Sequence, residues 1–291
     1  MGQRCTASAG GHKIAYYEAG PSDGPVVVLL HGLASDADTW DKAIGPLASH
    51  GLRVLALDLL GHGDSDKPAG SYLLTDFAAS LAAFLDALDI PSATLCGHSF
   101  GGAIALYFGS QYPERVQRIV LVSAGGLGRE VHPVLRAAAL PVAPALLRVA
   151  LLPRLRRLYG HPRLHRALRL TPDNLVNLRR AARALDSEAG QASFFASLRG
   201  VIAPSGQRTA SQEMRAFAEQ VPMLLIWNEG DPVIPVAHAQ AHLERAKPTT
   251  RLVVFPSRGH EPHRRSAQRF ADEVAAFVHS TEHPTMQDDS L

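Results

Sequence analysis

A serine among glycines is the residue of this sequence whose surroundings best suit nucleophilic chemistry. Ser99 lies in the segment GHSFGG (97–102), between an apolar run that predicts a strand, Ala93–Cys96, and a stretch with helical spacing, Ala103–Gln111. A G-x-S-x-G segment that joins a strand to a helix is typical of a nucleophile elbow. Glycines at these positions let strand and helix approach a strained serine backbone. We therefore predict that Ser99 is a catalytic nucleophile.

A serine hydroxyl is a weak nucleophile, so it requires a histidine base and an acid that orients the histidine. Asp231 follows the predicted strand Met223–Trp227, and His260 follows the predicted strand Arg251–Phe255. The chain order Ser, Asp, His is one of the known orders of a serine triad. We predict that His260 is the base and Asp231 the acid, with Glu229, two residues before Asp231, as the competing acid.

An acyl-transfer reaction also needs two N–H donors aimed at the oxygen that gains negative charge. The backbone N–H of Phe100, directly after the nucleophile, is the first candidate. The second is the N–H of Leu33, which follows His31 and Gly32 at the end of the predicted strand Val26–Leu30. Both donors belong to the backbone, so loop shape at these positions matters more than side-chain identity.

The elements that must position these residues alternate between short apolar runs and helical patterns, which indicates βαβ units and a mostly parallel sheet. Thr75 is the predicted N-cap of the first long helix. The remaining predicted elements are strands at Lys13–Glu18, Arg53–Leu57 and Arg118–Ser123 and helices at Thr75–Leu88, Val236–Ala246 and Arg264–Val278.

An arginine-rich segment interrupts this alternation. Residues 129–200 contain 13 Arg, no Lys and four acidic residues, whereas the whole chain has a formal net charge of +2. We interpret 129–205 as an inserted helical module between two parts of one core, 1–128 and 206–291. Its arginines form a solvated face, a platform for anionic substrates such as acyl-CoA esters, or a membrane-surface lid; the first is favoured. Part of the apolar stretch Val134–Leu158 is expected to line the substrate pocket.

Composition narrows the class of protein further. The 291 residues include only two cysteines, Cys5 and Cys96, and no Cys/His cluster that would suggest zinc. No signal peptide, spanning helix or nucleic-acid-binding motif is recognisable, so we expect a cytoplasmic protein with a small-molecule substrate. Gly2 and Thr6 fit a loose myristoylation pattern, but a frayed N-terminus is the favoured interpretation. A frayed end is also expected for Ser280–Leu291.

Taken together, these motifs resemble the α/β-hydrolase superfamily with a helical cap. The resemblance rests on HG at 31–32 with Trp40, DLLGHGDSDKP at 58–68, GHSFGG at 97–102, the Asp231 segment and GH at 259–260. It implies an α/β-hydrolase fold, with a mostly parallel eight-stranded sheet flanked by helices and a cap inserted after the sixth strand. The loop at 61–65 is usually structural in that family. The family pattern favours Asp231 over Glu229 because prolines follow Asp231, and the family's other acid position, after Arg118–Ser123, holds no carboxylate.

The resemblance implies a serine hydrolase that needs no metal or organic cofactor, and we expect a carboxylic ester hydrolase acting on a moderately apolar ester. Epoxide hydrolases and haloalkane dehalogenases of this fold use an Asp nucleophile, so Ser99 argues against both. Carbon–carbon bond hydrolases of the meta-cleavage-product type keep the triad but usually have a Gly-Pro-Gly-type oxyanion loop, where this chain has LASDA at 33–37. They and the thioesterases stay open as alternatives. A ligand-binding homologue is the non-enzyme alternative, although all three triad residues are present.

Overall fold

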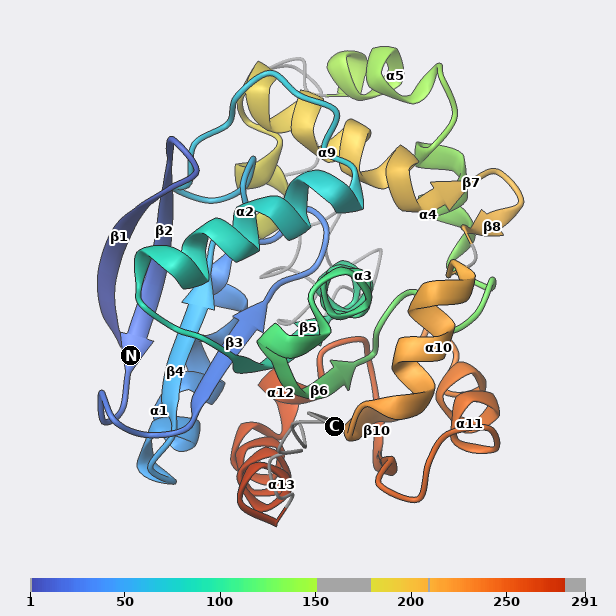
Figure 1. Ribbon diagram of the computed structural model, residues 1–291. Helices are drawn as coiled ribbons and strands as arrows, with labels where there is room; N and C mark the ends of the chain where they lie inside the picture. Colours follow the sequence, from blue (N-terminus) through green and yellow to red (C-terminus); the bar gives the residue numbers. More distant parts are fainter. Residues whose placement is uncertain (1, 151–178, 209, 281–291) are drawn as a thin grey trace, which may run out of the picture.

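The computed structural model describes residues 2–150, 179–208 and 210–280, and its centre is one eight-stranded sheet (Figure 1). The strand order is β1-β2-β4-β3-β5-β6-β9-β10. The pairs β1–β2 and β2–β4 are antiparallel, and the other neighbours are parallel. The predicted mostly parallel α/β sheet is confirmed. The strands are β1 (Gln3–Ala9), β2 (His12–Ala19), β3 (Val26–Leu30), β4 (Arg53–Leu57), β5 (Ala93–His98), β6 (Val116–Val122), β9 (Met223–Gly230) and β10 (Arg251–Arg258).

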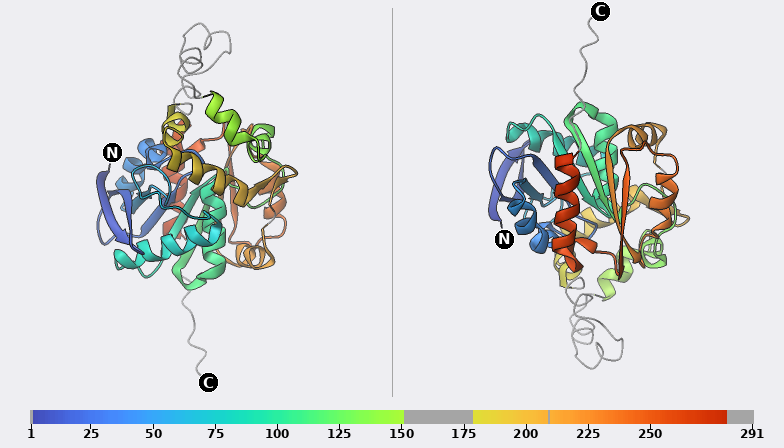
Figure 2. Two further views of the ribbon diagram at one scale, coloured as in Figure 1. Left: turned by 90° about the horizontal axis from the view of Figure 1, so that it is seen from above. Right: turned by 90° about the horizontal axis from the view of Figure 1, so that it is seen from below.

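The central strands are apolar along their length because helices cover both faces of the sheet. In β3, Val28 and Leu30 pack into the core on one face, and Val27 and Leu29 into the core on the other. All four side chains are fully buried. Helices α2 (Leu74–Ala87), α3 (Phe100–Gln111) and α10 (Gln212–Gln220) contribute to the first core, and α1 (Asp41–Ser49) and α13 (Ala267–Ser280) to the second. Figure 2 shows α13 lying across its face of the sheet.

Further short elements connect the strands or cap their ends. They are the 3-10 turns η1 (Ala37–Trp40) and η2 (Pro113–Arg115) and the helices α11 (Ala237–Leu243) and α12 (Pro262–Arg265). In the described ranges no helix is long and apolar enough to cross a lipid bilayer.

The segment after β6 leaves the sheet, as the resemblance implied. It comprises α4 (Pro133–Ala138), α5 (Ala143–Ala150), α9 (Glu188–Val201) and a hairpin of β7 (Ile202–Ala203) and β8 (Gly206–Gln207). A small core of its own joins these elements, with Leu198 fully buried at its centre. Residue 205, the predicted end of the inserted module, lies in the turn between β7 and β8. Much of the predicted arginine-rich helical region, 151–178, lies outside the described residues.

Two expectations about local structure were wrong. The N-terminus is not frayed: β1 pairs with β2 from Gln3 to Ala9, because residues of alternating character give this short stretch one face that packs on the sheet. Thr75 is not an N-cap, since α2 already begins at Leu74 and the Asp76 carboxylate accepts the Leu73 N–H at 3.0 Å. Of the end predicted to be frayed, Ser280–Leu291, Ser280 is the last residue of α13 (Ala267–Ser280), and residues 281–291 lie outside the described residues.

Candidate active site

Ser99 lies at a sharp turn between β5 and α3. Its backbone has φ 53° and ψ −112°, a left-handed conformation that a non-glycine residue rarely adopts and that stores strain. The neighbouring glycines are required by space. A Cβ at Gly97 would lie 2.4 Å from the Gly101 carbonyl oxygen, and a Cβ at Gly101 would lie 2.3 Å from the Leu30 carbonyl oxygen. The predicted strand–turn–helix geometry around Ser99 is therefore present.

The structure brings His260 and Asp231 into direct contact from the ends of β10 and β9. His260 Nδ1 lies 2.9 Å from Asp231 Oδ2 and 3.1 Å from Oδ1. Because an ionised carboxylate only accepts hydrogen bonds, Nδ1 carries the proton and donates it. The same carboxylate accepts the N–H groups of Val233 and Ile234 at 2.8 Å and 3.1 Å. By contrast, the competing acid, Glu229, is exposed to solvent.

The electrostatics of Asp231 suit an acid that stays ionised. Its side chain is fully buried, and burial on its own would raise the pKa of the carboxyl group. The hydrogen bond and charge of His260, with the Val233 N–H, outweigh burial and hold the pKa of Asp231 below its ordinary value. The other ring nitrogen, His260 Nε2, is buried and has no hydrogen-bond partner within the described part of the chain. That nitrogen is therefore free to accept a proton.

The loop that carries Leu33 packs closely against the nucleophile. A Cβ at Gly32 would lie 3.3 Å from Ser99 Cβ, so a larger residue at this position would crowd the nucleophile. The side chain of His31 also stabilises this loop. Its Nε2 accepts the Leu59 N–H at 3.1 Å, so the ring proton is on Nδ1. That Nδ1 donates to the Gly32 carbonyl at 2.8 Å. Among the turns, loops and helix caps of the described residues, no backbone carbonyl accepts the N–H of Leu33 or of Phe100. Phe100 is also the first residue of α3, where N–H groups lack intrahelical partners.

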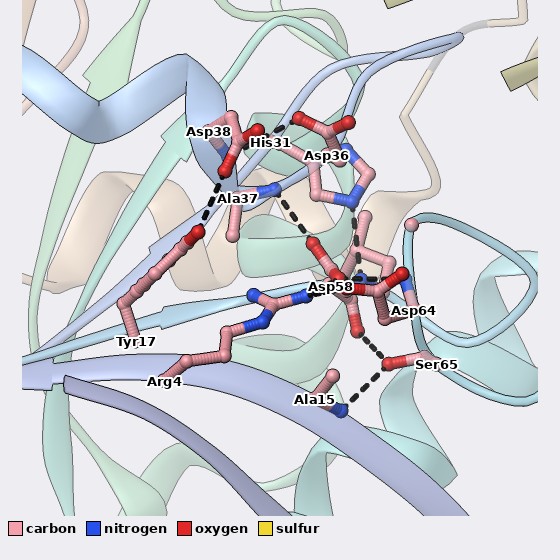
Figure 3. A network of polar contacts seen from close by, with 12 residues as sticks. Arg4, Ala15, Tyr17, His31, Asp36, Ala37, Asp38, Asp58, Asp64 and Ser65 are labelled. Atoms are coloured by element: carbon pink, nitrogen blue, oxygen red, sulfur yellow. Dashed lines mark hydrogen bonds and ion pairs between the residues drawn. The ribbon is translucent and has the colours of Figure 1, made fainter. Parts of the chain in front are cut away.

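A buried carboxylate fixes the far end of the same loop (Figure 3). Asp58, about 1% exposed, accepts the Ala37 N–H at 2.7 Å and the Asp64 N–H at 2.8 Å, and it forms an ion pair with Arg4 of β1. Ser65 adds a hydrogen bond from its hydroxyl to the Asp58 carbonyl at 2.7 Å. Asp58 therefore joins the loop at 33–37 to the loop at 61–65, and it contributes to loop shape rather than to chemistry.

A cavity of about 260 Å³ opens beside Ser99. Its wall is mostly apolar, and it is built from the core and from the inserted segment. The main lining side chains are Leu33, Leu74, Phe100, Tyr107, Val131, Leu135, Val201, Ile202, Met214 and Ile234, and Gln207 and Arg208 add polar groups. Leu135 belongs to the apolar stretch predicted to line the pocket, whereas Val134, Val142 and Leu146 of the same stretch are exposed. Its part at 151–158 lies outside the described residues.

Gln207 is a cavity residue that sequence reasoning missed. Its side chain is 7% exposed, accepts the Gly126 N–H at 3.2 Å and donates to the Glu130 carbonyl at 2.9 Å. Nothing in the local sequence distinguishes it from a surface glutamine, because both partners lie about 80 positions earlier in the chain.

Cys96, Trp40 and Trp227 are fully buried, and burial raises the pKa of the Cys96 thiol. The described ranges contain no group of three or more His, Cys, Asp or Glu suited to a metal ion.

Comparison with known proteins identifies the family. The family model for the alpha/beta hydrolase fold matches residues 25–264. An uncharacterized protein of Mycobacterium tuberculosis is 37% identical over 282 residues, covering 94% of this chain and 80% of that protein. The structure of a meta-cleavage product hydrolase from Pseudomonas fluorescens is similar at 25% identity with a TM-score of 0.73, covering 96% of this chain and 98% of the other.

A carboxylesterase from Bacillus subtilis has the same fold, with a TM-score of 0.69 at 21% identity and coverage of 97% of this chain and 93% of the other. The family match extends from β3 to α12 and so includes the elbow, the Asp231 loop and the His260 turn. The chain therefore belongs to the alpha/beta hydrolase family.

Proposed function

We propose that this protein is a serine hydrolase that cleaves a moderately apolar ester through an acyl-enzyme. The observation that carries the proposal is the geometry of His260. Its Nδ1 is held by a buried, ionised Asp231 at 2.9 Å, while its Nε2 has no hydrogen-bond partner among the described residues. This is the arrangement that a general base requires, and Ser99, whose backbone is strained at the elbow, lines the cavity.

The residues have these roles in the proposed reaction. Ser99 Oγ attacks the ester carbonyl carbon while His260 Nε2 takes the hydroxyl proton. The carbonyl oxygen becomes an oxyanion, which the N–H groups of Leu33 and Phe100 stabilise. The tetrahedral intermediate then collapses, His260 returns the proton to the leaving alcohol, and an acyl-enzyme remains. Water, activated by His260, attacks the acyl group and releases the acid and free Ser99.

The cavity supports an apolar substrate. Twelve side chains of its wall are apolar or aromatic, and Arg208 is its only charged lining residue among the described ones. Burial of an apolar acyl or alkyl group contributes about 0.8 kcal/mol per methylene. A volume of about 260 Å³ limits the enclosed group to a medium-sized one. We further propose that residues 129–205 form a cap inserted between the core segments 1–128 and 206–291 of the chain. The cytoplasm stays the predicted location.

Carbon–carbon bond hydrolysis is the second candidate. The solved meta-cleavage product hydrolase covers almost the whole chain, and the proposed triad would serve either chemistry. The loop at 33–37 favours the ester, because its sequence is LASDA, whereas the resemblance implies a Gly-Pro-Gly-type oxyanion loop for carbon–carbon bond hydrolases. Thioester hydrolysis would use the same residues.

The test is hydrolysis of p-nitrophenyl esters from acetyl to palmitoyl, with the parent protein, Ser99→Ala and the matched control Ser110→Ala run side by side. Ser110 lies at the far end of α3, where its hydroxyl donates to the Tyr107 carbonyl. We expect turnover to vanish in Ser99→Ala and to persist in Ser110→Ala. Ester turnover that survives in Ser99→Ala would refute the proposal, and turnover of a ring-cleavage dienoate without any ester turnover would favour the second candidate.

A further inference from the structure

His98, the residue before Ser99, contacts the segment that carries the proposed base. Its Nε2 lies 2.8 Å from the His260 backbone carbonyl oxygen, although the two residues are 162 positions apart. A carbonyl oxygen only accepts, so His98 Nε2 carries the proton and donates it. The two imidazole rings also pack together, with centroids 4.8 Å apart. The end of β5 is thereby tied to the turn between β10 and α12.

The His98 ring has little freedom to move. It is 5% exposed and packs against two fully buried rings, His263 at 4.7 Å and Trp40 at 6.4 Å between centroids. The Gly32 backbone also lies near the ring, because a Cβ at Gly32 would lie 3.2 Å from His98 Nδ1. A ring enclosed in this way directs its one donor toward a fixed point.

The charge state of His98 agrees with a single donor. Burial, followed by the repulsion of His260, lowers the pKa of His98 to about 3. The imidazole is therefore neutral near neutral pH, and its one N–H is the group that faces His260. Its Nδ1 has no hydrogen-bond partner within the described ranges.

The backbone around His260 is held at two further points. The Gly259 carbonyl accepts from Asn228 Nδ2 at 2.9 Å, and the Gly259 N–H donates to the Gly230 carbonyl at 3.2 Å. Residues of β9 make both contacts, and both hold Gly259, the residue before His260. The His98 contact is the one that reaches the His260 carbonyl itself, on the side of the elbow. It therefore controls the backbone position from which the imidazole projects.

We propose that His98 is a positioning residue, whose Nε2–H bond to the His260 carbonyl holds the base so that its Nε2 meets Ser99. The inference rests on the proposed function, since it assigns a role within the same triad. A shift of about 1 Å in a catalytic group costs about 100-fold in rate. Loss of the donor is thus expected to lower kcat by about that factor, with little change in KM because His98 does not line the cavity.

Three substitutions separate the hydrogen bond from the packing. In His98→Gln the amide nitrogen lies the same number of bonds from Cα as Nε2, so the donor is kept. In His98→Asn the amide reaches only the place of Nδ1, so polarity is kept but the donor is displaced. His98→Leu removes both. His242→Leu is the control, since His242 is an equally buried histidine on α11, away from the cavity.

We expect the Leu and Asn variants to lose about 100-fold in kcat and the Gln variant to recover most of it, with thermal unfolding recorded for every variant. The low-field proton resonance of the His260–Asp231 pair gives a readout that does not need turnover. It should shift or broaden in the Asn and Leu variants and return in the Gln variant. If Leu does not fold, the comparison of Asn with Gln still decides.

Equal kcat in the Asn and Gln variants, or a parent-like resonance in Asn, would overturn the positioning role. Parent-like kcat in a folded Leu variant would do the same. Failure of the proposed function is recognised separately, because it would leave Ser99→Ala active. An inactive Ser99→Ala beside a fully active His98→Asn would reject only the role of His98.

Discussion

Replacing Asp231 by Asn tests the proposed triad most directly, because the structure predicts how the amide must turn. Asp231 Oδ1 accepts two backbone N–H groups, from Val233 and Ile234, and an amide nitrogen cannot occupy that place. The Asn oxygen therefore takes the Oδ1 position, and its NH₂ group faces His260 Nδ1. Because the Oδ2 position is the nearer one to Nδ1, at 2.9 Å against 3.1 Å, we expect Nδ1 to accept from the NH₂ group and Nε2 to carry the proton, where a base needs a lone pair.

The wrong tautomer is expected to lower kcat by about 10⁴-fold, which corresponds to about 5 kcal/mol of transition-state stabilisation. The fold should persist, since the amide keeps the volume and the two backbone hydrogen bonds of the carboxylate. KM should change little because Asp231 does not line the cavity. The assay is steady-state hydrolysis of the best p-nitrophenyl ester, together with a thermal unfolding curve for each variant.

Glu229→Gln is the matched control, because Glu229 is a nearby acid on the same strand end and is exposed. It should retain the turnover of the parent protein. If Asp231→Asn were almost fully active while Glu229→Gln lost activity, the acid would be Glu229 and the tautomer argument would be refuted. Loss of activity in Asp231→Asn through unfolding alone would be visible in its melting curve.

Three further outcomes are expected. Asp58→Ala should lower the free energy of unfolding by about 3 kcal/mol in urea titrations, because two backbone N–H groups and Arg4 lose a buried partner; exposed Asp23→Ala should cost far less. Leu135→Trp should move the ester optimum to shorter acyl chains by filling the cavity, whereas Leu146→Trp, at a side chain 61% exposed, should leave it unchanged. His62 is neutral in the folded state because burial lowers its pKa to about 3, whereas the unfolded chain binds this proton below about pH 6.5. The free energy of unfolding should therefore fall as the pH drops from 6.5 toward 3. In His62→Phe this decrease should be shallower by up to about 1.4 kcal/mol per pH unit. The same pH dependence in the variant and the parent protein would contradict a neutral, buried His62.

The mostly parallel sheet could be predicted from the sequence, and so could the candidate residues of the site, because these residues lie at fixed places relative to strands. Ser99, Asp231 and His260 each follow an apolar run that can be recognised locally, and parallel strands bring such ends to one edge of the sheet. The seven predicted strands are all present. The family confirmed by comparison agrees with the resemblance.

The features that escaped prediction depend on packing between distant segments. Strand β1 has few large apolar residues, and only its pairing with β2 makes it a strand. The short helices α1 and α10 were not predicted either; α1 contains Pro46, and the buried residues of α10 are Met214 and Ala218. The hydrogen bonds of Gln207 and His98 join residues 77 to 162 positions apart, which no local pattern reveals.

The side chain of Gln207 has a consequence for the evolution and engineering of this enzyme. It hydrogen-bonds to Gly126 and Glu130, where the chain leaves the sheet, and it lies itself where the chain returns. The part of the chain that enters the inserted segment and the part that leaves it are thus joined to each other by hydrogen bonds. Insertions whose ends meet are tolerated best, because the host does not have to stretch. We therefore expect that the segment between Glu130 and Gln207 can be exchanged between relatives without disturbing the sheet.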